Sequence, residues 1–280
     1  LKYLTLTYAM LFGVVGDKLY YSDIGTPDYW PATNFIDFDA DITGIGAVPN
    51  GLIVFTRFKT FVITGNSPST FTKYLLSGEQ GCESHYTIQY VANSLMWVSA
   101  DGICATSGGD ITIVSQQKLG KIDFGTLNNA QVFDRVYYLS TDTEIIAFDF
   151  RYNPVVRKIQ TSCGWLGTFN DKLYAFDTAS IYEMFTGAAL EYSWKSAVLT
   201  EGGYSNYKVF KDFYIKYNGN INVKVYVDGT LVGSKDLTGD TCYNMKVLNS
   251  AKGYGLEIEL TGTGEVSEIE YKAMGRQNGR

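Results

Sequence analysis

Short apolar runs separated by polar turns recur along the first two thirds of the chain. Residues 88–106 are the clearest example, with apolar runs at 88–91, 95–98 and 103–106. Ala92-Asn93-Ser94 separates the first two runs, and Asp101-Gly102 precedes the third. Because glycine tolerates positive φ, an Asp-Gly pair favours a two-residue hairpin turn. The stretch is therefore predicted to form three antiparallel strands.

Four other stretches, beginning at residues 12, 46, 130 and 167, repeat the same order of apolar strand and polar turn. The first turns centre on Gly16, Asn50, Asn93, Asp134 and Asn170, and subtraction of residue numbers gives spacings of 34, 43, 41 and 36. A degenerate repeat of about 40 residues with about four short strands is typical of a β-propeller blade. Such a blade needs neighbours to cover its apolar faces. We predict a β-propeller-like domain over residues 1–190, with a β-sandwich or β-barrel as the alternative.

The pattern changes after residue 190, where strands become longer and alternate strictly. Apolar residues at 223, 225 and 227 alternate with more polar ones at 224, 226 and 228. A sheet with one buried face and one solvent-exposed face is typical of an antiparallel sandwich. We predict a small β-sandwich domain over residues 191–280. Its hairpin turns are expected at Asn218-Gly219, Asp228-Gly229 and Gly262-Thr263-Gly264.

Composition supports an all-β globular protein. The chain has 22 Tyr, 16 Phe and 29 Gly in 280 residues, so strand-forming and turn-forming residues are both abundant. No long stretch has helical periodicity. No apolar run approaches the roughly 18 residues of a membrane span, and no secretory signal is visible. The chain begins with Leu1, so its amino end looks cut.

The formal net charge of −6 argues against stable binding of nucleic acid. Proteins that grip phosphates carry clustered Lys and Arg, whereas here these residues are scattered. An acidic surface could still border a channel through which DNA must pass without binding.

Cysteine, histidine and carboxylate patterns give no catalytic, cofactor-binding or metal-binding residue. The four cysteines lie in no Cys-x-x-Cys pair, and we expect buried free thiols at Cys82, Cys104, Cys163 and Cys242. Cys82 and His85 could be read as nucleophile and base, but their spacing at the head of a strand does not favour that geometry. His85 is the one histidine, so a catalytic triad or a two-histidine metal site has no second candidate.

Three alternating carboxylates, at Asp37, Asp39 and Asp41, could hold Ca²⁺ on one face of a strand. The EF-hand pattern requires Gly and Glu where this chain has Ile42 and Val48, so that match fails. We interpret the three aspartates as a solvated acidic strand face. Glu79 and Glu83 could in principle serve a glycosidase, but nothing in the sequence distinguishes them from other acidic residues.

Three passages together resemble a known family. They are KLYYSDIGTPDYWPATNFIDF, GLIVFTRFKTFVITG and GCESHYTIQYVANSLMWVSADGI, and YSWKSAVLT opens the second domain in a similar way. They resemble the tail hub and nozzle proteins of short-tailed bacteriophages, of the packaged-DNA-stabilising tail protein and tail tubular protein B type. The resemblance is one of residue types and covers most of the chain, which is shorter than usual family members.

The resemblance implies a structural, non-enzymatic subunit of the virion tail. Copies would form a ring, expected to be a hexamer, between the adaptor and portal-side proteins and the tail fibres. Packaged double-stranded DNA would pass through the lumen without specific binding.

The residues themselves leave two other classes of function open. One is a carbohydrate-binding adhesion module, for which the aromatic residues Tyr29, Trp30 and Tyr204 are candidates. The other is a sialidase or glycosidase on a propeller scaffold. The scattered arginines argue against a sialidase, which would need an arginine cluster to hold a carboxylate.

Overall fold

A computed structural model describes residues 1–119, 124–151, 155–187, 191–200, 203, 207–246 and 251–275. The chain divides into two compact units, Leu1–Phe185 and Thr186–Arg280. The sequence-based boundary lies a few residues later, after residue 190. Residues 276–280 lie outside the described part. Each unit is described by itself.

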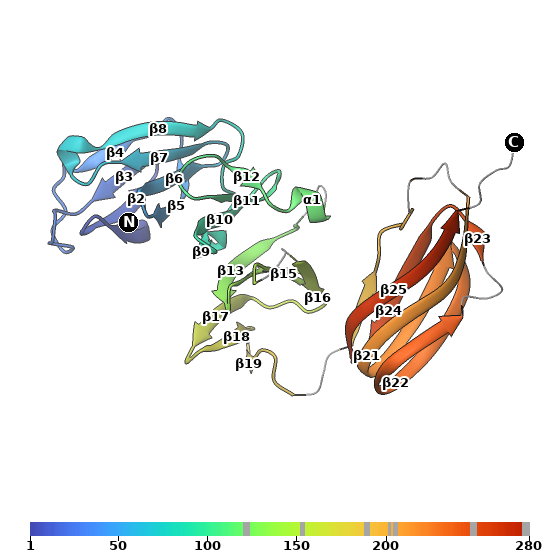
Figure 1. Cartoon of the computed structure of the whole chain (residues 1–280). Coiled ribbons are helices and arrows are strands. Elements are labelled where there is room, and N and C mark those ends of the chain that lie inside the picture. The colour runs from blue at the N-terminus through green and yellow to red at the C-terminus, as the bar shows by residue number, and fades with distance from the viewer. Residues whose placement is uncertain are drawn as a thin grey trace, which may run out of the picture. The chain divides into compact units, whose positions relative to one another are not determined.

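In the described part of the first unit, five antiparallel sheets follow one another along the chain (Figure 1). We call them blades 1 to 5. Blade 1 is β1 (Lys2–Thr7), β2 (Met10–Val15), β3 (Lys18–Tyr21) and β4 (Phe35–Asp37); blade 2 is β5 (Ile42–Val48), β6 (Gly51–Thr56), β7 (Thr60–Thr64) and β8 (Thr72–Ser77). Blade 3 is β9 (Gln89–Val91), β10 (Ser94–Ser99), β11 (Gly102–Thr106) and β12 (Thr112–Ile113); blade 4 is β13 (Leu127–Phe133), β14 (Val136–Thr141), β15 (Ile145–Asp149) and β16 (Val155–Ile159). Blade 5 is β17 (Trp165–Phe169), β18 (Lys172–Phe176) and β19 (Ile181–Glu183).

The predicted turns are two-residue hairpin loops, but the first was assigned to the wrong place in its blade. In blades 2 to 5 the loops at Asn50, Asn93, Asp134 and Asn170 join the first strand to the second. Gly16 instead joins β2 to β3, and the equivalent loop of blade 1 is Tyr8-Ala9, where both residues have positive φ. The sequence pattern missed that loop because it contains no Gly, Asn or Asp. In blade 3, Ala100-Asp101 forms the second hairpin loop, one residue earlier than predicted, and Gly102 begins β11.

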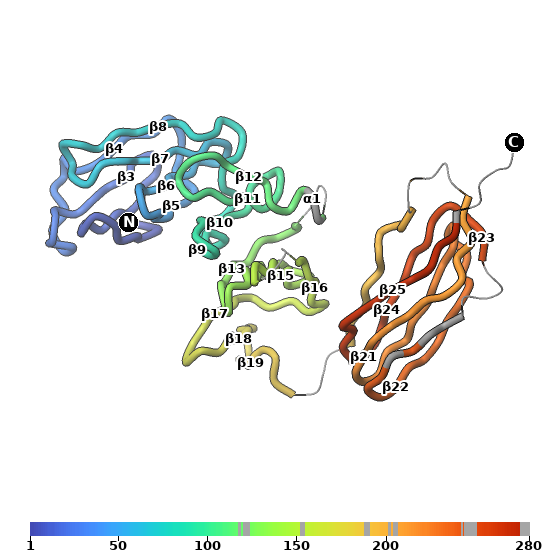
Figure 2. The backbone as a smooth tube through the Cα atoms, in the orientation of Figure 1, coloured from blue at the N-terminus to red at the C-terminus, as the bar shows by residue number. Residues whose placement is uncertain are grey.

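Successive blades pack face to face, which is the packing of a β-propeller. Each of four apolar clusters joins one blade to the next, and Figure 2 shows the blades in chain order from blue to yellow-green. For example, Phe12 of blade 1 packs in one cluster with Leu52 of blade 2, whereas Phe55 on the same strand as Leu52 packs with Trp97 of blade 3. None of the clusters of described residues joins blade 5 to blade 1. The prediction of an all-β propeller-type fold is confirmed.

A charged network fixes the connection that follows β15. Arg151 binds Asp149 through two contacts, Nε to Oδ1 at 3.0 Å and Nη2 to Oδ2 at 2.7 Å. The same guanidinium reaches Asp134 at 2.7 Å, and Arg157 approaches Asp149 at 3.3 Å. The Asp149 side chain is 6% exposed. Hydrogen bonding to Arg151 lowers the pKa of this carboxyl from 3.8 to about 2.

The network predicts a pH-dependent contribution to stability. Because the folded pKa of Asp149 lies below its unfolded value, its contribution is present above about pH 4 and is lost as the pH falls towards 2. We expect Asp149→Asn to lower the free energy of unfolding by about 2 kcal/mol at pH 7 and by clearly less at pH 3. Urea titrations at the two pH values measure this difference. Asp134→Asn, at the exposed end of the network, is the control and should change little; an equal loss for Asp149→Asn at both pH values would contradict the assignment.

Among the residues described in the second unit, six strands form one hydrogen-bonded sheet with β21 (Lys208–Val227) at its centre. One edge of β21 pairs with β22 (Thr230–Lys246) along most of its length. The other edge pairs in turn with β25 (Glu265–Gly275), β24 (Leu256–Gly262) and the short β23 (Lys252–Gly253), and β20 (Tyr192–Lys195) pairs with β24. Apolar side chains of these strands form a single core. The predicted division into two sheets of a sandwich remains a prediction.

Two of the three turns predicted in this unit are wrong. Asn218-Gly219 lies inside β21, because the chain continues through Gly219 at φ 95° instead of reversing. Residues 262–264 connect β24 to β25, yet both strands pair with β21 and not with each other. Glycine is required there, since a Cβ on Gly262 or Gly264 would lie 2.3 or 2.5 Å from a backbone oxygen of β21. Asp228-Gly229 does form the predicted hairpin between β21 and β22.

Helix is scarce in the described residues, where we find only α1 (Gln116–Leu119) and the short 3-10 helices η1 (Pro68–Thr70) and η2 (His85–Thr87). Among these residues no helix has the length and apolar character needed to span a membrane.

Candidate functional site

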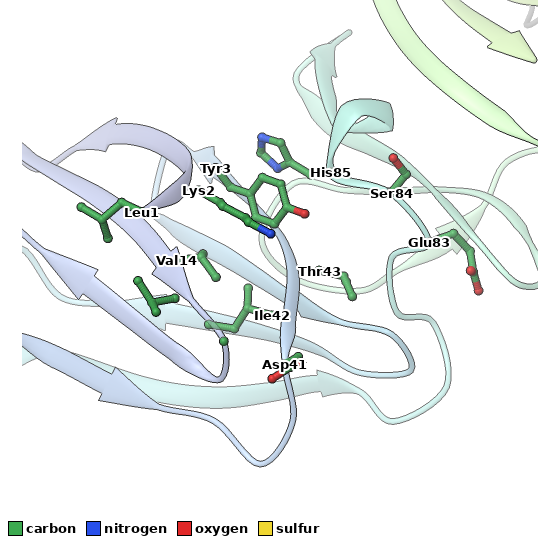
Figure 3. A pocket seen from close by; sticks show the side chains of 12 residues that line it. Leu1, Lys2, Tyr3, Val14, Asp41, Ile42, Thr43, Glu83, Ser84 and His85 are labelled. Atoms are coloured by element: carbon green, nitrogen blue, oxygen red, sulfur yellow. The ribbon is translucent and has the colours of Figure 1, made fainter.

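A cavity of about 570 Å³ opens where the first strands of blades 1 and 2 meet the segment that enters blade 3 (Figure 3). Strand β1 contributes Lys2 and Tyr3, and the start of β5 contributes Ile42 and Thr43 beside Asp41. The segment before β9 contributes the third wall, made of Glu83, Ser84 and His85. The Lys2 side chain and the carboxylates of Asp41 and Glu83 therefore line a partly aromatic pocket.

Tyr3 and His85 stack at the rim of this cavity, with ring centroids 4.2 Å apart and planes at 29°. Burial lowers the pKa of His85 to about 4, and burial also raises the pKa of Tyr3. Both rings are therefore neutral at pH 7. The His85 Nδ1 atom is buried and has no hydrogen-bond partner among the described residues.

The structure does not activate Cys82 as a nucleophile. Its thiol is buried and donates to the carbonyl of Ser84 at 3.2 Å. Burial raises the pKa of Cys82 to about 12, so the thiolate is scarce at neutral pH. His85, with a pKa of about 4, is a weak base there. Cys82, Cys104 and Cys163 are buried free thiols as predicted, whereas the side chain of Cys242 lies outside the described residues.

The three aspartates do not share one strand face, which corrects the sequence interpretation. Asp37 ends β4 and pairs with Lys18, while Asp39 and Asp41 lie in the connection to β5. Asp39 pairs with Lys59, and Asp41 lines the large cavity. Each carboxylate therefore has its own surroundings because β4 is only three residues long. The described residues contain no group of His, Cys, Asp or Glu side chains suited to a metal ion.

A second cavity, of about 150 Å³, lies among the first strands of blades 3, 4 and 5. Tyr86 and Trp165 meet there edge to face, with centroids 5.1 Å apart and planes at 69°. Both side chains remain half exposed, at 51% and 44%. The amides of Gln89 and Gln131 complete the wall. Sequence reasoning missed this site, since Tyr86 and Trp165 belong to different blades and neither lies in a recognisable motif.

The aromatic residues singled out from the sequence lie elsewhere. Tyr29 is exposed in the loop before β4, and Trp30 is held there by its indole N–H, which donates to the Pro27 carbonyl at 2.9 Å. Tyr204 lies outside the described residues. Trp97 is fully buried between blades 2 and 3.

Comparisons with known proteins give only distant likenesses. No family model matches the chain, and no curated protein matches it. Among solved structures, Hsv2 of Kluyveromyces lactis is 14% identical with a TM-score of 0.43, over 64% of this chain and 60% of that one. The N-terminal domain of Nup159 is 10% identical with a TM-score of 0.41, over 94% and 90%. An exo-β-1,3-galactanase from Phanerochaete chrysosporium is 10% identical with a TM-score of 0.32, over 94% and 75%.

Proposed function

We propose that the chain is a structural subunit of a bacteriophage tail, of the hub or nozzle type, in which copies form a ring around the DNA-ejection channel. The observation that carries the proposal is that the two end blades present apolar residues to solvent. On blade 1, Leu4 and Leu6 of β1 are 56% and 67% exposed. On blade 5, Phe169 and Ile181 are 68% and 66% exposed. Exposed apolar surface of this kind marks protein–protein contacts.

Head-to-tail contact between copies would cover both ends. The two end blades differ in sequence, so a contact between them is heterologous, and heterologous contacts that close generate rings. The resemblance of the sequence to tail hub and nozzle proteins implies the assembly. In it, a ring that is expected to be a hexamer contacts adaptor and portal-side proteins on one side and tail fibres on the other. In such a ring the chain would act as a wall element of the tail tube and would retain packaged DNA mechanically.

The charge of the chain is compatible with a DNA channel. With a formal net charge of −6, the surface repels phosphates, and a repulsive lumen would let double-stranded DNA slide without being held. The protonated thiol of Cys82 and the weakly basic His85 also favour a mechanical role over nucleophilic chemistry.

The oligomeric state of the purified full chain tests the proposal. We expect rings by negative-stain electron microscopy and a single oligomer by native mass spectrometry. Phe169→Asp places a carboxylate in the proposed contact and should shift the protein to monomers. Phe58→Asp is the matched control, because Phe58 is 61% exposed but lies at the turn between β6 and β7 of blade 2. A wild-type chain that stays monomeric at high concentration and is absent from virion tails would overturn the proposal.

A further inference from the structure

We propose that the cavity between Tyr86 and Trp165 is a binding site for a neutral pyranose sugar. The proposal stands on the described side chains of blades 3 to 5 and does not depend on ring formation. Figure 1 shows the first strands of these blades, β9, β13 and β17, next to one another.

The two aromatic rings form a corner of the kind that sugars bind. The rings are nearly perpendicular, at 69°, with their centroids 5.1 Å apart, so a pyranose can stack on one face while its rim contacts the other ring. Both rings keep about half of their surface open to solvent, so a ligand can reach them. Their amphipathic surface suits a ligand that has apolar C–H faces and a polar edge.

Two glutamine side chains supply hydrogen-bonding groups at the same cavity. The Gln89 Nε2 group donates to the Ala130 carbonyl at 2.9 Å, and the Gln131 Nε2 group donates weakly to Thr168 Oγ1 at 3.3 Å. These bonds hold the two amides in place. Among the described residues neither Oε1 atom has a hydrogen-bond partner, so two acceptors are available for sugar hydroxyls.

Strand β17 is held rigidly under the site. The buried Asn129 donates from Nδ2 to the Leu166 carbonyl at 2.8 Å and accepts from the Leu166 N–H at 2.7 Å. This pair of bonds ties blade 4 to blade 5 directly beside Trp165. A binding site needs such support, because positioning by rigid strands reduces the entropy lost when the ligand binds.

The lining residues define the ligand class. Tyr86, Ile88, Gln89, Asn129, Ala130, Gln131 and Trp165 are uncharged, and His85, which closes the cavity, is neutral at pH 7. No cation among them would hold a phosphate or a carboxylate. The volume of about 150 Å³ is enough for a single sugar ring and too small for a nucleotide. The large cavity differs in both respects, since Lys2, Asp41 and Glu83 surround about 570 Å³.

Titration of the full chain with methyl glycosides of glucose, galactose and N-acetylglucosamine tests the site. We expect saturation-transfer NMR signals from at least one of them and a millimolar Kd, which is the range that about a dozen ligand atoms supply. Trp165→Ala and Tyr86→Ala should each weaken binding about tenfold or more, and Gln131→Ala should weaken it less. Circular dichroism checks that each variant is folded.

Trp30→Ala is the matched control, since Trp30 is another partly exposed tryptophan of the first unit but lies outside the cavity. Its binding should equal that of the wild type. Three results would overturn the proposal. The first is that no neutral glycoside binds at a concentration of about 10 mM, tenfold above the expected Kd. The second is that binding persists in both Trp165→Ala and Tyr86→Ala. The third is that methyl glucuronide binds more tightly than methyl glucoside.

Discussion

Trp97→Ala is expected to destabilise the first unit by about 4 kcal/mol, measured as the free energy of unfolding in urea. Trp97 is fully buried, and its ring lies 4.7 Å from that of Phe55 across the boundary between blades 3 and 2. Its indole N–H donates to the Gly81 carbonyl at 2.9 Å inside the protein. Truncation would therefore leave a large cavity and a buried carbonyl without its partner.

Two further variants separate these contributions. Trp97→Phe keeps most of the packing but removes the hydrogen bond, so its loss should be clearly smaller than that of Trp97→Ala. Trp194→Ala removes a tryptophan that is 46% exposed in the second unit and should cost under about 1 kcal/mol. A loss below about 1 kcal/mol for Trp97→Ala would show that blades 2 and 3 do not depend on this contact.

The blades could be predicted from the sequence wherever the residue types in a turn identify it as a turn. Asn50, Asn93, Asp134 and Asn170 revealed four loops because Asn and Asp adopt tight turns readily. Tyr8-Ala9 adopts the same loop in blade 1 with φ values of 52° and 56°, although neither Tyr nor Ala is a residue type typical of such a turn. There the pairing of β1 with β2 outweighs local preference. The repeat was therefore found, but its phase in the first blade was wrong.

The second unit shows the opposite error. Asn218-Gly219 has strong hairpin chemistry, yet it lies within β21, where Gly219 comes so close to Gly264 that a Cβ would lie 2.8 Å from the Gly264 Cα. The glycine serves a close approach of two backbones rather than a reversal. Sequence alone cannot separate these two uses, because both need a residue without a side chain.

The candidate sugar site could not be predicted because it is assembled from distant segments. Tyr86 lies in η2 before blade 3 and Trp165 begins blade 5, and their contact requires blades 3, 4 and 5 to stack in order. Local patterns predict strands and turns, but the angle between successive blades decides which side chains meet at their first strands. Trp30 and Tyr29 are candidates from the sequence because they are aromatic, and residue type alone carries no information about a shared cavity.

Asn129→Ala is expected to loosen blade 5 selectively, with a loss of about 3 kcal/mol in the stability of that blade. Asn129 is 2% exposed and makes two short bonds to the backbone of Leu166. Without them, a buried N–H and a buried C=O of β17 lose their partners. Because blades interact mainly with their neighbours, an end blade can open while the others remain folded.

Hydrogen exchange followed by mass spectrometry distinguishes this local opening from global unfolding. Peptides covering β17 and β18 should exchange about a hundredfold faster in Asn129→Ala, since 3 kcal/mol corresponds to about two powers of ten in an opening equilibrium. Peptides of blade 2 should be unchanged. Gln131→Ala is the control on the same strand, because its amide makes only a long 3.3 Å bond to blade 5. Uniformly faster exchange in all five blades would mean that the first unit opens as one body. The position of Trp165 would then depend on all five blades and not on the two hydrogen bonds between Asn129 and Leu166.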